Sequence, residues 1–227
     1  MKIDTEFSKY ANDYGNYNII QQKVASKLLS HVKGKPQNIL DLGCGRGALV
    51  EKIDWDYHHF VGVDFAKGML ELHPKSQKIE CIYGNFNDNT LFKYLYTYQF
   101  DYILSASALQ WAENLDNVFA HIAQFATPFS LAIFTANTFQ TLHKTAGIHS
   151  PLRDKEEIYE LQKRHLNAKF EVVEYTLKFE NTQDIFRYIK KSGVSGSRNV
   201  LSFKQMKQLM KEYPLNSLEF EVVFLYS

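Results

Sequence analysis

The chain has 227 residues, of which 45% are apolar and 22% charged, with a formal net charge of +1. This composition argues against an intrinsically disordered chain, and the length fits one α/β domain. No window approaches about 18 uninterrupted apolar residues, and the first residues lack the apolar core of a signal peptide, so we expect a cytoplasmic protein. Two cysteines, Cys44 and Cys81, are too few for a disulfide framework or a zinc site, so free thiols are expected.

Apolar periodicity predicts the order of the elements. Apolar residues at helical spacing predict helices over residues 19–32, 114–125, 154–165, 182–191 and 202–213. Short apolar runs, typical of strands buried on both faces of a sheet, occupy residues 38–42, 60–64, 78–83, 100–107 and 130–136. Two later runs, 170–179 and 218–226, alternate more and predict closing strands, one of them antiparallel. Strands that alternate with helices predict a Rossmann-like α/β fold, a mostly parallel sheet with helices on both faces.

Residues 137–169 interrupt this alternation. The segment begins as irregular sequence around Gly147, His149 and Pro151 and becomes helical from Asp154. Two interpretations stay open, an insertion over an active site or a surface excursion without a functional role. No Pro-rich or Gly-rich linker divides the chain, so we expect a single domain over residues 1–227.

The first predicted strand leads into a glycine-rich turn. Residues 39–47 read Ile-Leu-Asp-Leu-Gly-Cys-Gly-Arg-Gly, and such glycines permit a tight turn and let the backbone approach a ligand. Dinucleotide dehydrogenases use the spacing G-x-G-x-x-G, whereas here the third glycine follows one residue after the second. Asp41 precedes the first glycine by two residues, where its carboxylate can meet the ammonium or sulfonium of a methyl donor. The alternative is that Asp41 only caps the turn.

Polar residues also follow the next two strands. Asp64 ends the second strand, where a carboxylate can accept hydrogen bonds from both ribose hydroxyls. Phe65 and Met69 follow, and they are candidates either to pack on an adenine or to pack at a helix start. After the third strand, the amide oxygen of Asn85 can accept a hydrogen bond from the adenine amino group.

Together these motifs resemble those of the class I S-adenosylmethionine-dependent methyltransferases, over about residues 37–136. The resemblance implies a seven-stranded sheet whose last strand is antiparallel, with the methyl donor over the C-terminal ends of the first strands. It also implies S-adenosyl-L-methionine as the donor, S-adenosyl-L-homocysteine as the product, and no metal. The donor-contacting residues expected on this basis are Tyr17, Gln21, Asp41, Gly43, Gly45, Asp64, Phe65, Met69, Asn85, Phe86 and Ser105.

Segments on both sides of that core resemble the malonyl-acyl carrier protein O-methyltransferases of biotin synthesis, the BioC type. The similar segments are Phe7 to Tyr14 (an N-terminal lid), Leu109 to Trp111 (a Leu-Gln-Trp signature), Leu142-His143, and Tyr188 to Val194. Gly15 and Asn85 depart from that pattern, in the lid and at the adenine contact. The resemblance implies a carboxyl O-methyltransferase that methylates the free carboxylate of malonyl-acyl carrier protein or malonyl-coenzyme A. The acceptor residues expected are Tyr14, Gln110, Trp111, His143 and Arg153.

This resemblance divides the single domain into four segments. Residues 1–33 are expected to form an N-terminal lid and helix, and residues 37–136 the donor-binding core. Residues 137–169 are expected to form an insertion over the site, and residues 170–227 the closing strands and basic helices.

A basic stretch lies near the C-terminus. Residues 187–211 hold seven lysines and arginines and no Asp or Glu. The stretch is either a docking surface for an acidic acyl carrier protein or a solvated helix face. Two other functions stay open, methylation of another small carboxylic acid or quinone precursor, and donor binding without activity. Nucleic-acid and membrane partners are not expected.

Overall fold

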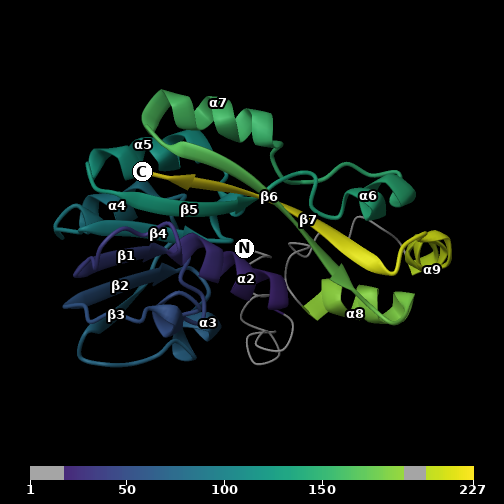
Figure 1. Cartoon of the computed structure of the whole chain (residues 1–227), viewed down its shortest axis with the longest axis horizontal. Helices are drawn as coiled ribbons and strands as arrows, with labels where there is room; N and C mark the ends of the chain where they lie inside the picture. The colour runs from purple at the N-terminus through teal and green to yellow at the C-terminus, as the bar shows by residue number, and fades with distance from the viewer. Residues whose placement is uncertain (1–17, 192–202) are drawn as a thin grey trace.

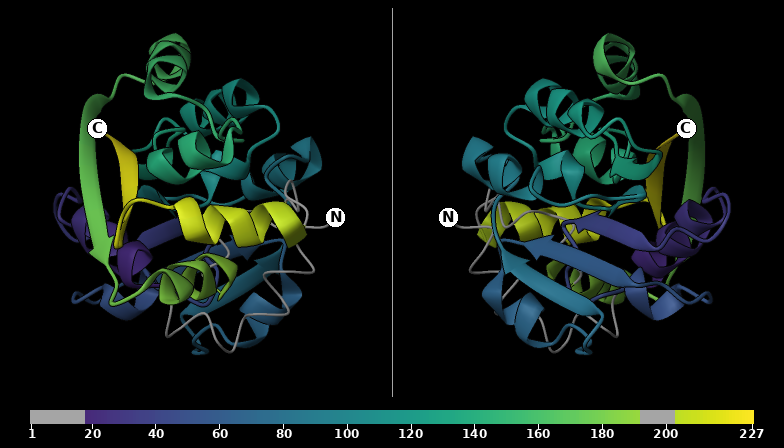
Figure 2. Two further views of the ribbon diagram at one scale, coloured as in Figure 1. Left: turned by 90° about the vertical axis from the view of Figure 1, so that its right-hand side faces the viewer. Right: turned by 90° about the vertical axis from the view of Figure 1, so that its left-hand side faces the viewer.

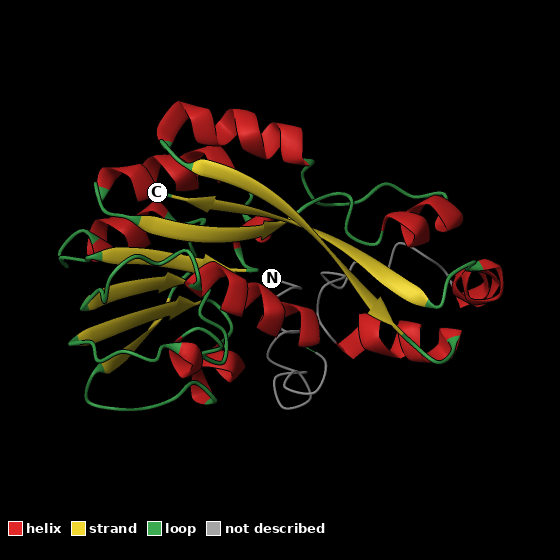
Figure 3. Cartoon of the chain, in the orientation of Figure 1, coloured by secondary structure: helices red, strands yellow, loops and turns green. Residues whose placement is uncertain are grey.

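A computed structural model describes residues 18–191 and 203–227, which fold around one mixed sheet (Figure 1, Figure 3). The strand order within these residues is β3-β2-β1-β4-β5-β7-β6. The strands are β1 (Asn38–Leu42), β2 (His59–Asp64), β3 (Ile79–Tyr83), β4 (Tyr102–Ala106), β5 (Phe129–Phe134), β6 (Lys169–Lys178) and β7 (Ser217–Tyr226). The helices are α2 (Ile19–Leu29), α3 (Lys67–Glu71), α4 (Asn89–Leu95), α5 (Leu115–Gln124), α6 (Gln140–Ala146), α7 (Lys155–His165), α8 (Thr182–Lys191) and α9 (Phe203–Glu212). Short 3-10 helices are η1 (Val50–Lys52) and η2 (Leu109–Trp111).

The first five strands run parallel to one another. β1 lies between β2 and β4, with Asp41 opposite Gly62 on one side and Leu104 on the other. β7 runs antiparallel to both β5 and β6, which confirms the expected seven-stranded sheet with an antiparallel last strand. Because the C-terminal ends of parallel strands meet at one edge, the loops after β1, β2, β3 and β4 gather there.

Helices cover both faces of the sheet (Figure 2). Successive side chains of a strand point to opposite faces. Ile39 therefore packs in the apolar cluster that contains Val24 of α2, whereas Leu40 packs in the cluster that contains Phe92 of α4 and Phe119 of α5. Burial on both faces explains why these strands are continuous apolar runs in the sequence. None of the helices in the described ranges is long and apolar enough to cross a bilayer.

The long antiparallel pair β6 and β7 carries a group of helices beyond the parallel strands. Figure 1 shows α6, α8 and α9 around the far end of this pair, at the right of the view. We call these three helices the cap. Leu142 of α6, Tyr188 of α8 and Leu209 of α9 belong to one buried apolar cluster with Phe220 of β7. The cap is therefore joined to the sheet by side-chain packing as well as by the two strands.

The segment after β5 is more helical than the sequence predicted. Residues 140–146 form α6, where irregular backbone was expected, and α6 ends at Gly147 with φ of 63°. Only Leu142 of this short helix is buried, so the local sequence has no amphipathic stripe that would identify it. Contacts with α9 and β7, distant in sequence, support α6. The helix that was predicted in this segment, over residues 154–165, is present as α7.

Candidate active site

The glycine turn after β1 is held by the neighbouring strand. The backbone amides of Gly43 and Cys44 both donate to the carbonyl oxygen of Val63, at 2.8 and 3.0 Å. Gly43 and Gly45 have φ of 80° and 54°, left-handed values that favour glycine. A Cβ atom on Gly43 would lie 2.2 Å from the Cβ of Ala108. Only glycine fits where this turn meets the segment after β4.

Asp64, at the end of β2, connects the second strand to this turn. Its Oδ2 accepts a hydrogen bond from the amide of Gly45 at 2.9 Å, and its Oδ1 accepts one from the amide of Ala66 at 2.8 Å. A carboxylate oxygen can accept more than one hydrogen bond, so both oxygens retain capacity for ligand hydroxyls. One carboxylate thus fixes the shape of the turn from the end of the neighbouring strand.

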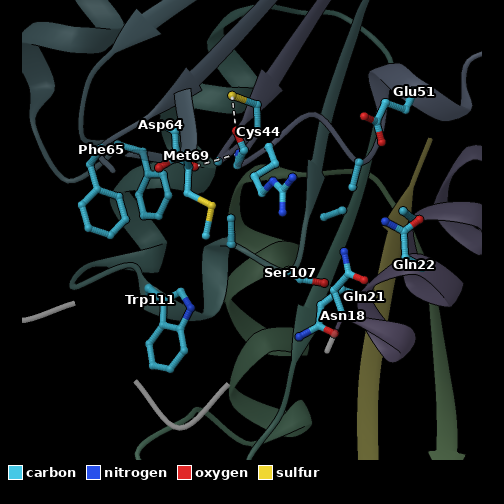
Figure 4. A pocket seen from close by; sticks show the side chains of 18 residues that line it. Asn18, Gln21, Gln22, Cys44, Glu51, Asp64, Phe65, Met69, Ser107 and Trp111 are labelled. Atoms are coloured by element: carbon cyan, nitrogen blue, oxygen red, sulfur yellow. Dashed lines mark hydrogen bonds between the residues drawn. The ribbon is translucent and has the colours of Figure 1, made fainter. Parts of the chain in front are cut away.

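A cavity of about 260 Å³ opens beside the turn, and we call it the first cavity. Figure 4 shows Asn18, Gln21 and Ser107 on one side of it, with Asp64 and Phe65 on the other. Its lining includes Asn18, Gln21, Gly43, Gly45, Arg46, Glu51, Asp64, Phe65, Met69, Phe86, Ser107 and Trp111. A Cβ atom on Gly45 would meet no atom within 4 Å. The bare backbone at Gly45 therefore leaves space for a ligand.

Two charged residues of this lining, Arg46 and Glu51, were not among the expected site residues. Arg46 stands between the second and third glycines of the turn, and Glu51 lies in η1 just after it. A guanidinium and a carboxylate in one cavity match the two charges of a zwitterionic amino-acid group. The position of Arg46 inside the glycine motif was a usable sequence signal, whereas nothing in the sequence marks Glu51.

A second cavity of about 520 Å³ lies beside the first. Phe65, Phe86 and Trp111 line both cavities and so form the wall between them. The other residues that line the second cavity are Asn85, Asn87, Gln110, Ala112, Glu113, Pro151, Leu152, Arg153 and Glu157. Residues from η2 and from the segment before α7 therefore meet at one place.

Polar groups in the second cavity are partly engaged with the protein. Nε2 of Gln110 donates to the carbonyl oxygen of Ser107 at 2.6 Å. Nε of Arg153 pairs with Oε1 of Glu157 at 3.0 Å, and its Nη2 donates to the carbonyl oxygen of Glu113 at 3.2 Å. A guanidinium has five N–H groups, so Arg153 retains donors for a ligand.

A comparison with known protein families decides what kind of site this is. Residues 39–128 match the family model described as a methyltransferase domain. That range contains the glycine turn, Asp64 and the wall shared by the two cavities. The chain is an S-adenosylmethionine-dependent methyltransferase, and it resembles the class I family. The predicted fold, enzyme class and family resemblance are thereby confirmed.

Curated relatives of this methyltransferase carry one recurring description. The malonyl-[acyl-carrier protein] O-methyltransferase of Bacillus cereus is 28% identical over 62% of the chain, which spans 55% of that relative's length. The corresponding protein of Haemophilus influenzae is 27% identical, with 86% of the chain and 78% of the relative covered. A third, from Ilyobacter polytropus, is 26% identical, with 88% of the chain and 82% of the relative covered.

Solved structures share the fold of this methyltransferase. The YcgJ protein from Bacillus subtilis superposes with a TM-score of 0.63 at 12% identity, over 89% of the chain and 96% of that protein. Phosphoethanolamine N-methyltransferase 2 of Haemonchus contortus, solved with S-adenosyl-L-methionine, superposes with a TM-score of 0.51 at 15% identity, over 89% of the chain and 52% of that protein. At such identities the likeness shows the fold alone.

Most of the residues expected to contact the methyl donor come together in the first cavity. Those that line it are Gln21, Gly43, Gly45, Asp64, Phe65, Met69 and Phe86. Asn85 lines the second cavity instead, where its side chain is exposed and its Oδ1 accepts a hydrogen bond from the amide of Asn87 at 2.9 Å. An amide oxygen has two lone pairs, so one is left for an adenine amino group. In the described part of the methyltransferase, no cluster of three His, Cys, Asp or Glu side chains could hold a metal.

Asp41 and Ser105 do not line either cavity, in contrast to the prediction. Asp41 is 1% exposed, and its Oδ1 has no hydrogen-bond partner among the described residues. Burial and the nearby charge of Asp64 raise the pKa of Asp41 well above its usual value. Oγ of the fully buried Ser105 donates to the carbonyl oxygen of Leu42 at 2.6 Å, which ties β4 to β1. Both residues support the turn from behind, because their strands bury these side chains.

Three of the expected acceptor residues meet in the second cavity, namely Gln110, Trp111 and Arg153. His143 lies on α6, half-buried, and lines neither cavity. Its Nδ1 has no partner among residues 18–191 and 203–227, and burial lowers the pKa of the imidazole. The expected lid residues Tyr14 and Tyr17, and the segment 192–194, lie outside the described residues.

Proposed function

We propose that this methyltransferase transfers the methyl group of S-adenosylmethionine to the free carboxylate of a malonyl thioester, at the start of biotin synthesis. One observation carries the proposal. Relatives described as malonyl-[acyl-carrier protein] O-methyltransferases align with 86 to 94% of the chain, so the similarity includes the cap as well as the donor-binding core. The cap helices therefore belong to the resemblance.

The first cavity fits the methyl donor. Phe65, Met69 and Phe86 offer apolar surface to an adenine, and Asp64 offers carboxylate oxygens to the ribose hydroxyls. Arg46 and Glu51 offer the charges that complement the amino-acid end. When bound, the donor supplies an electrophilic methyl group on a positively charged sulfur.

The remaining groups of the site suit an acceptor that is already ionised. A carboxylic acid with a pKa near about 4 is ionised at neutral pH, so the nucleophile needs no general base. Gln21 of α2 and Gln110 of η2 supply amides, Ser107 between β4 and η2 supplies a hydroxyl, and Trp111 supplies aromatic surface. These groups are proposed to orient and desolvate the nucleophile. Orientation alone contributes up to about 7 to 11 kcal/mol in well-aligned systems. Charge is neutralised as the carboxylate meets the sulfonium, so a dry site favours the reaction.

Arg153 is the proposed charged partner of the acceptor in the second cavity. Its guanidinium already touches Glu157 and Glu113, which fixes its direction, and its remaining N–H groups are donors for a carboxylate or thioester carbonyl. Trp111 lines both cavities and is proposed as a wall of the acceptor pocket. Tyr14 and His143 remain proposed acceptor contacts. Unchanged kcat/KM for the malonyl substrate in Tyr14→Phe and His143→Ala would remove these two residues from the mechanism.

The cap offers a basic surface for an acidic carrier protein. Lys204, Lys207 and Lys211 lie three and four residues apart on α9, so they share one face, and all three are exposed. No ion pair within the described residues involves them. Arg187 of α8 is instead paired with Asp184. We propose that the carrier protein docks on the lysine face of α9 rather than on the whole basic stretch.

Complementation of a biotin-requiring strain that lacks this methylation step tests the proposed function. Growth without biotin is the expected result. In parallel, the purified enzyme is offered malonyl-acyl carrier protein and trans-aconitate. Turnover of trans-aconitate alone would replace the proposal by the broader small-acid function, and donor binding without turnover of either would favour a non-catalytic module.

A further inference from the structure

Ser107 holds an unusual backbone conformation at the edge of the first cavity. It follows directly after β4, and its φ is 60°, in the left-handed region that residues other than glycine rarely adopt. The backbone of a non-glycine residue in this region is strained and persists only where surrounding contacts hold it. Such residues cluster at functional sites. The strain alone does not identify a role, so the contacts of Ser107 matter.

Both backbone groups of Ser107 are fixed by hydrogen bonds. Its amide donates to the carbonyl oxygen of Ala132 in β5 at 2.9 Å. Its own carbonyl oxygen accepts from Nε2 of Gln110 at 2.6 Å. The next residue, Ala108, lies against the glycine turn at Gly43. The backbone at Ser107 is therefore held in place before any ligand binds.

The side chain of Ser107, in contrast, has no hydrogen-bond partner in the part of the chain that the structure describes. Its Oγ is buried and makes no hydrogen bond to any described residue, and the same is true of Oε1 of Gln21, which is 6% exposed. Both side chains line the first cavity, on the same side of it in Figure 4. A buried polar atom without a partner is costly, so two of them at one end of a cavity point to polar ligand atoms there.

The other parts of the cavity already match the methyl donor. Asp64 and Phe65 lie on the opposite side from Ser107, where the nucleoside is proposed to bind. Arg46 and Glu51 supply the charges for the amino-acid end. The Ser107 hydroxyl is a neutral donor, which suits the remaining ligand group, the carboxylate of the acceptor. Oε1 of Gln21 is an acceptor and suits a donor group of a ligand instead.

We infer that the Ser107 hydroxyl donates a hydrogen bond to the acceptor carboxylate, and that Gln110 is a positioning residue that acts through Ser107. This inference rests on the proposed function. The hydroxyl binds the carboxylate oxygen that does not attack, which leaves a lone pair of the other oxygen directed at the methyl group. Gln110, expected from the sequence to touch the acceptor itself, instead fixes the carbonyl of Ser107 so that the hydroxyl stays aimed into the cavity.

Three variants test this assignment. Ser107→Ala removes the hydroxyl, and Ser107→Gly removes the hydroxyl together with the backbone strain. Gln110→Leu removes the bond to the Ser107 carbonyl. Gln162→Leu is the matched control, because Gln162 is also a buried glutamine with an unpartnered Oε1 but lines neither cavity. Each variant is assayed with malonyl-acyl carrier protein for kcat and KM, and with S-adenosylhomocysteine for Kd by calorimetry.

We expect Ser107→Ala and Ser107→Gly to lower kcat/KM for the acceptor about tenfold or more, while the Kd for S-adenosylhomocysteine changes less than about twofold. Ser107→Gly should also raise the Tm, a combination that a purely structural role does not produce. Gln110→Leu should follow Ser107→Ala, and Gln162→Leu should keep wild-type kinetics.

Wild-type kcat/KM in both Ser107 variants, or a loss confined to S-adenosylhomocysteine affinity, overturns the assignment of Ser107 and leaves the proposed function intact. Absence of turnover by the wild-type enzyme overturns the proposed function itself and the carboxylate contact with it.

Discussion

Gly45 and Asp64 are joined by a 2.9 Å hydrogen bond from the amide of Gly45 to Oδ2 of Asp64. This bond couples the shape of the glycine turn to the end of β2. A single carboxylate therefore fixes the position of the turn and is also the group proposed to contact the ribose. Substitution of Asp64 should affect stability and donor affinity together.

Asp64→Asn replaces one acceptor oxygen by an NH2 group, which cannot accept from a backbone amide. We expect the free energy of unfolding to fall by about 1 to 3 kcal/mol and the Kd for S-adenosylhomocysteine to rise about tenfold or more. Urea unfolding and calorimetry measure the two effects. Asp101→Asn is the control, because Oδ2 of Asp101 also accepts two backbone amides, from Gln37 and Asn38, outside both cavities. A similar loss of donor affinity in the control would contradict a specific role for Asp64.

Gly45→Ala tests the bare backbone at the first cavity. Gly45 and Gly34 both have positive φ, 54° and 75°, and a Cβ atom on either would meet no atom within 4 Å. Replacement of either glycine by alanine should therefore lower the free energy of unfolding by about 1 kcal/mol through backbone strain. Only Gly45 lines the cavity, so only Gly45→Ala should weaken S-adenosylhomocysteine binding, by about tenfold. Equal Kd values for the two variants would show that the ligand does not approach Gly45.

Acid should weaken the hydrogen bonds through which Glu221 of β7 holds the two ends of the segment 137–154. It is 3% exposed, and it accepts from Oγ1 of Thr135 at 2.6 Å, Nδ2 of Asn137 at 3.0 Å and Nζ of Lys155 at 3.1 Å. Burial raises the pKa of this carboxyl, but the three hydrogen bonds outweigh it and hold the pKa below its usual 4.5. The charged form of Glu221 is thus favoured in the folded state. Its contribution to the free energy of unfolding is lost as pH falls below about 4.5.

Glu221→Gln should lower the free energy of unfolding by about 1 to 2 kcal/mol at neutral pH. Its difference from the wild type should shrink as the pH falls through the lowered pKa. Urea unfolding across this pH range measures the difference. Glu160→Gln removes an exposed pair with Lys163 and should change little at any pH. A constant difference between Glu221→Gln and wild type would show that the charge of Glu221 is not the source of the stability.

Charge reversal on α9 tests carrier-protein docking. The triple variant Lys204→Glu, Lys207→Glu and Lys211→Glu should lower kcat/KM for malonyl-acyl carrier protein about tenfold at low salt, and added salt should reduce the difference. Turnover of malonyl-coenzyme A should stay near the wild-type value. A triple control at the exposed residues Lys35, Lys93 and Lys163 makes the same change of net charge outside the cap. Equal losses in the two triple variants, or equal salt sensitivity for both substrates, would contradict docking on α9.

The fold could be predicted closely from the sequence where burial alone determines the pattern. The predicted strand 38–42 and helix 182–191 coincide with β1 and α8. Burial on both faces produces a continuous apolar run, and burial of one helix face produces apolar residues at helical spacing, so both elements can be recognised from the sequence. α6 was missed because contacts with α9 and β7 stabilise it, and no local pattern reports them.

The candidate site was predictable where backbone geometry requires a residue type, as at Gly43, and less so where a side chain can face either way. Asp41 and Ser105 have the chemistry of ligand-binding residues, but the structure directs them into the protein. The contact between Gln110 and the Ser107 carbonyl depends on a left-handed turn that no spacing rule reveals. Arg153 lies 40 residues after Glu113 in the sequence, yet both line the second cavity. Only the family resemblance predicted Arg153 as a site residue.

Every described residue of the first cavity lies between Asn18 and Trp111, whereas the cap is built from residues 140 onward. The residues proposed to bind the methyl donor and those proposed to dock the carrier protein thus come from different stretches of the gene. Substitutions on the lysine face of α9 can therefore alter carrier-protein docking without changing the residues that line the first cavity. This separation means that the docking surface and the donor site can be altered independently by substitution.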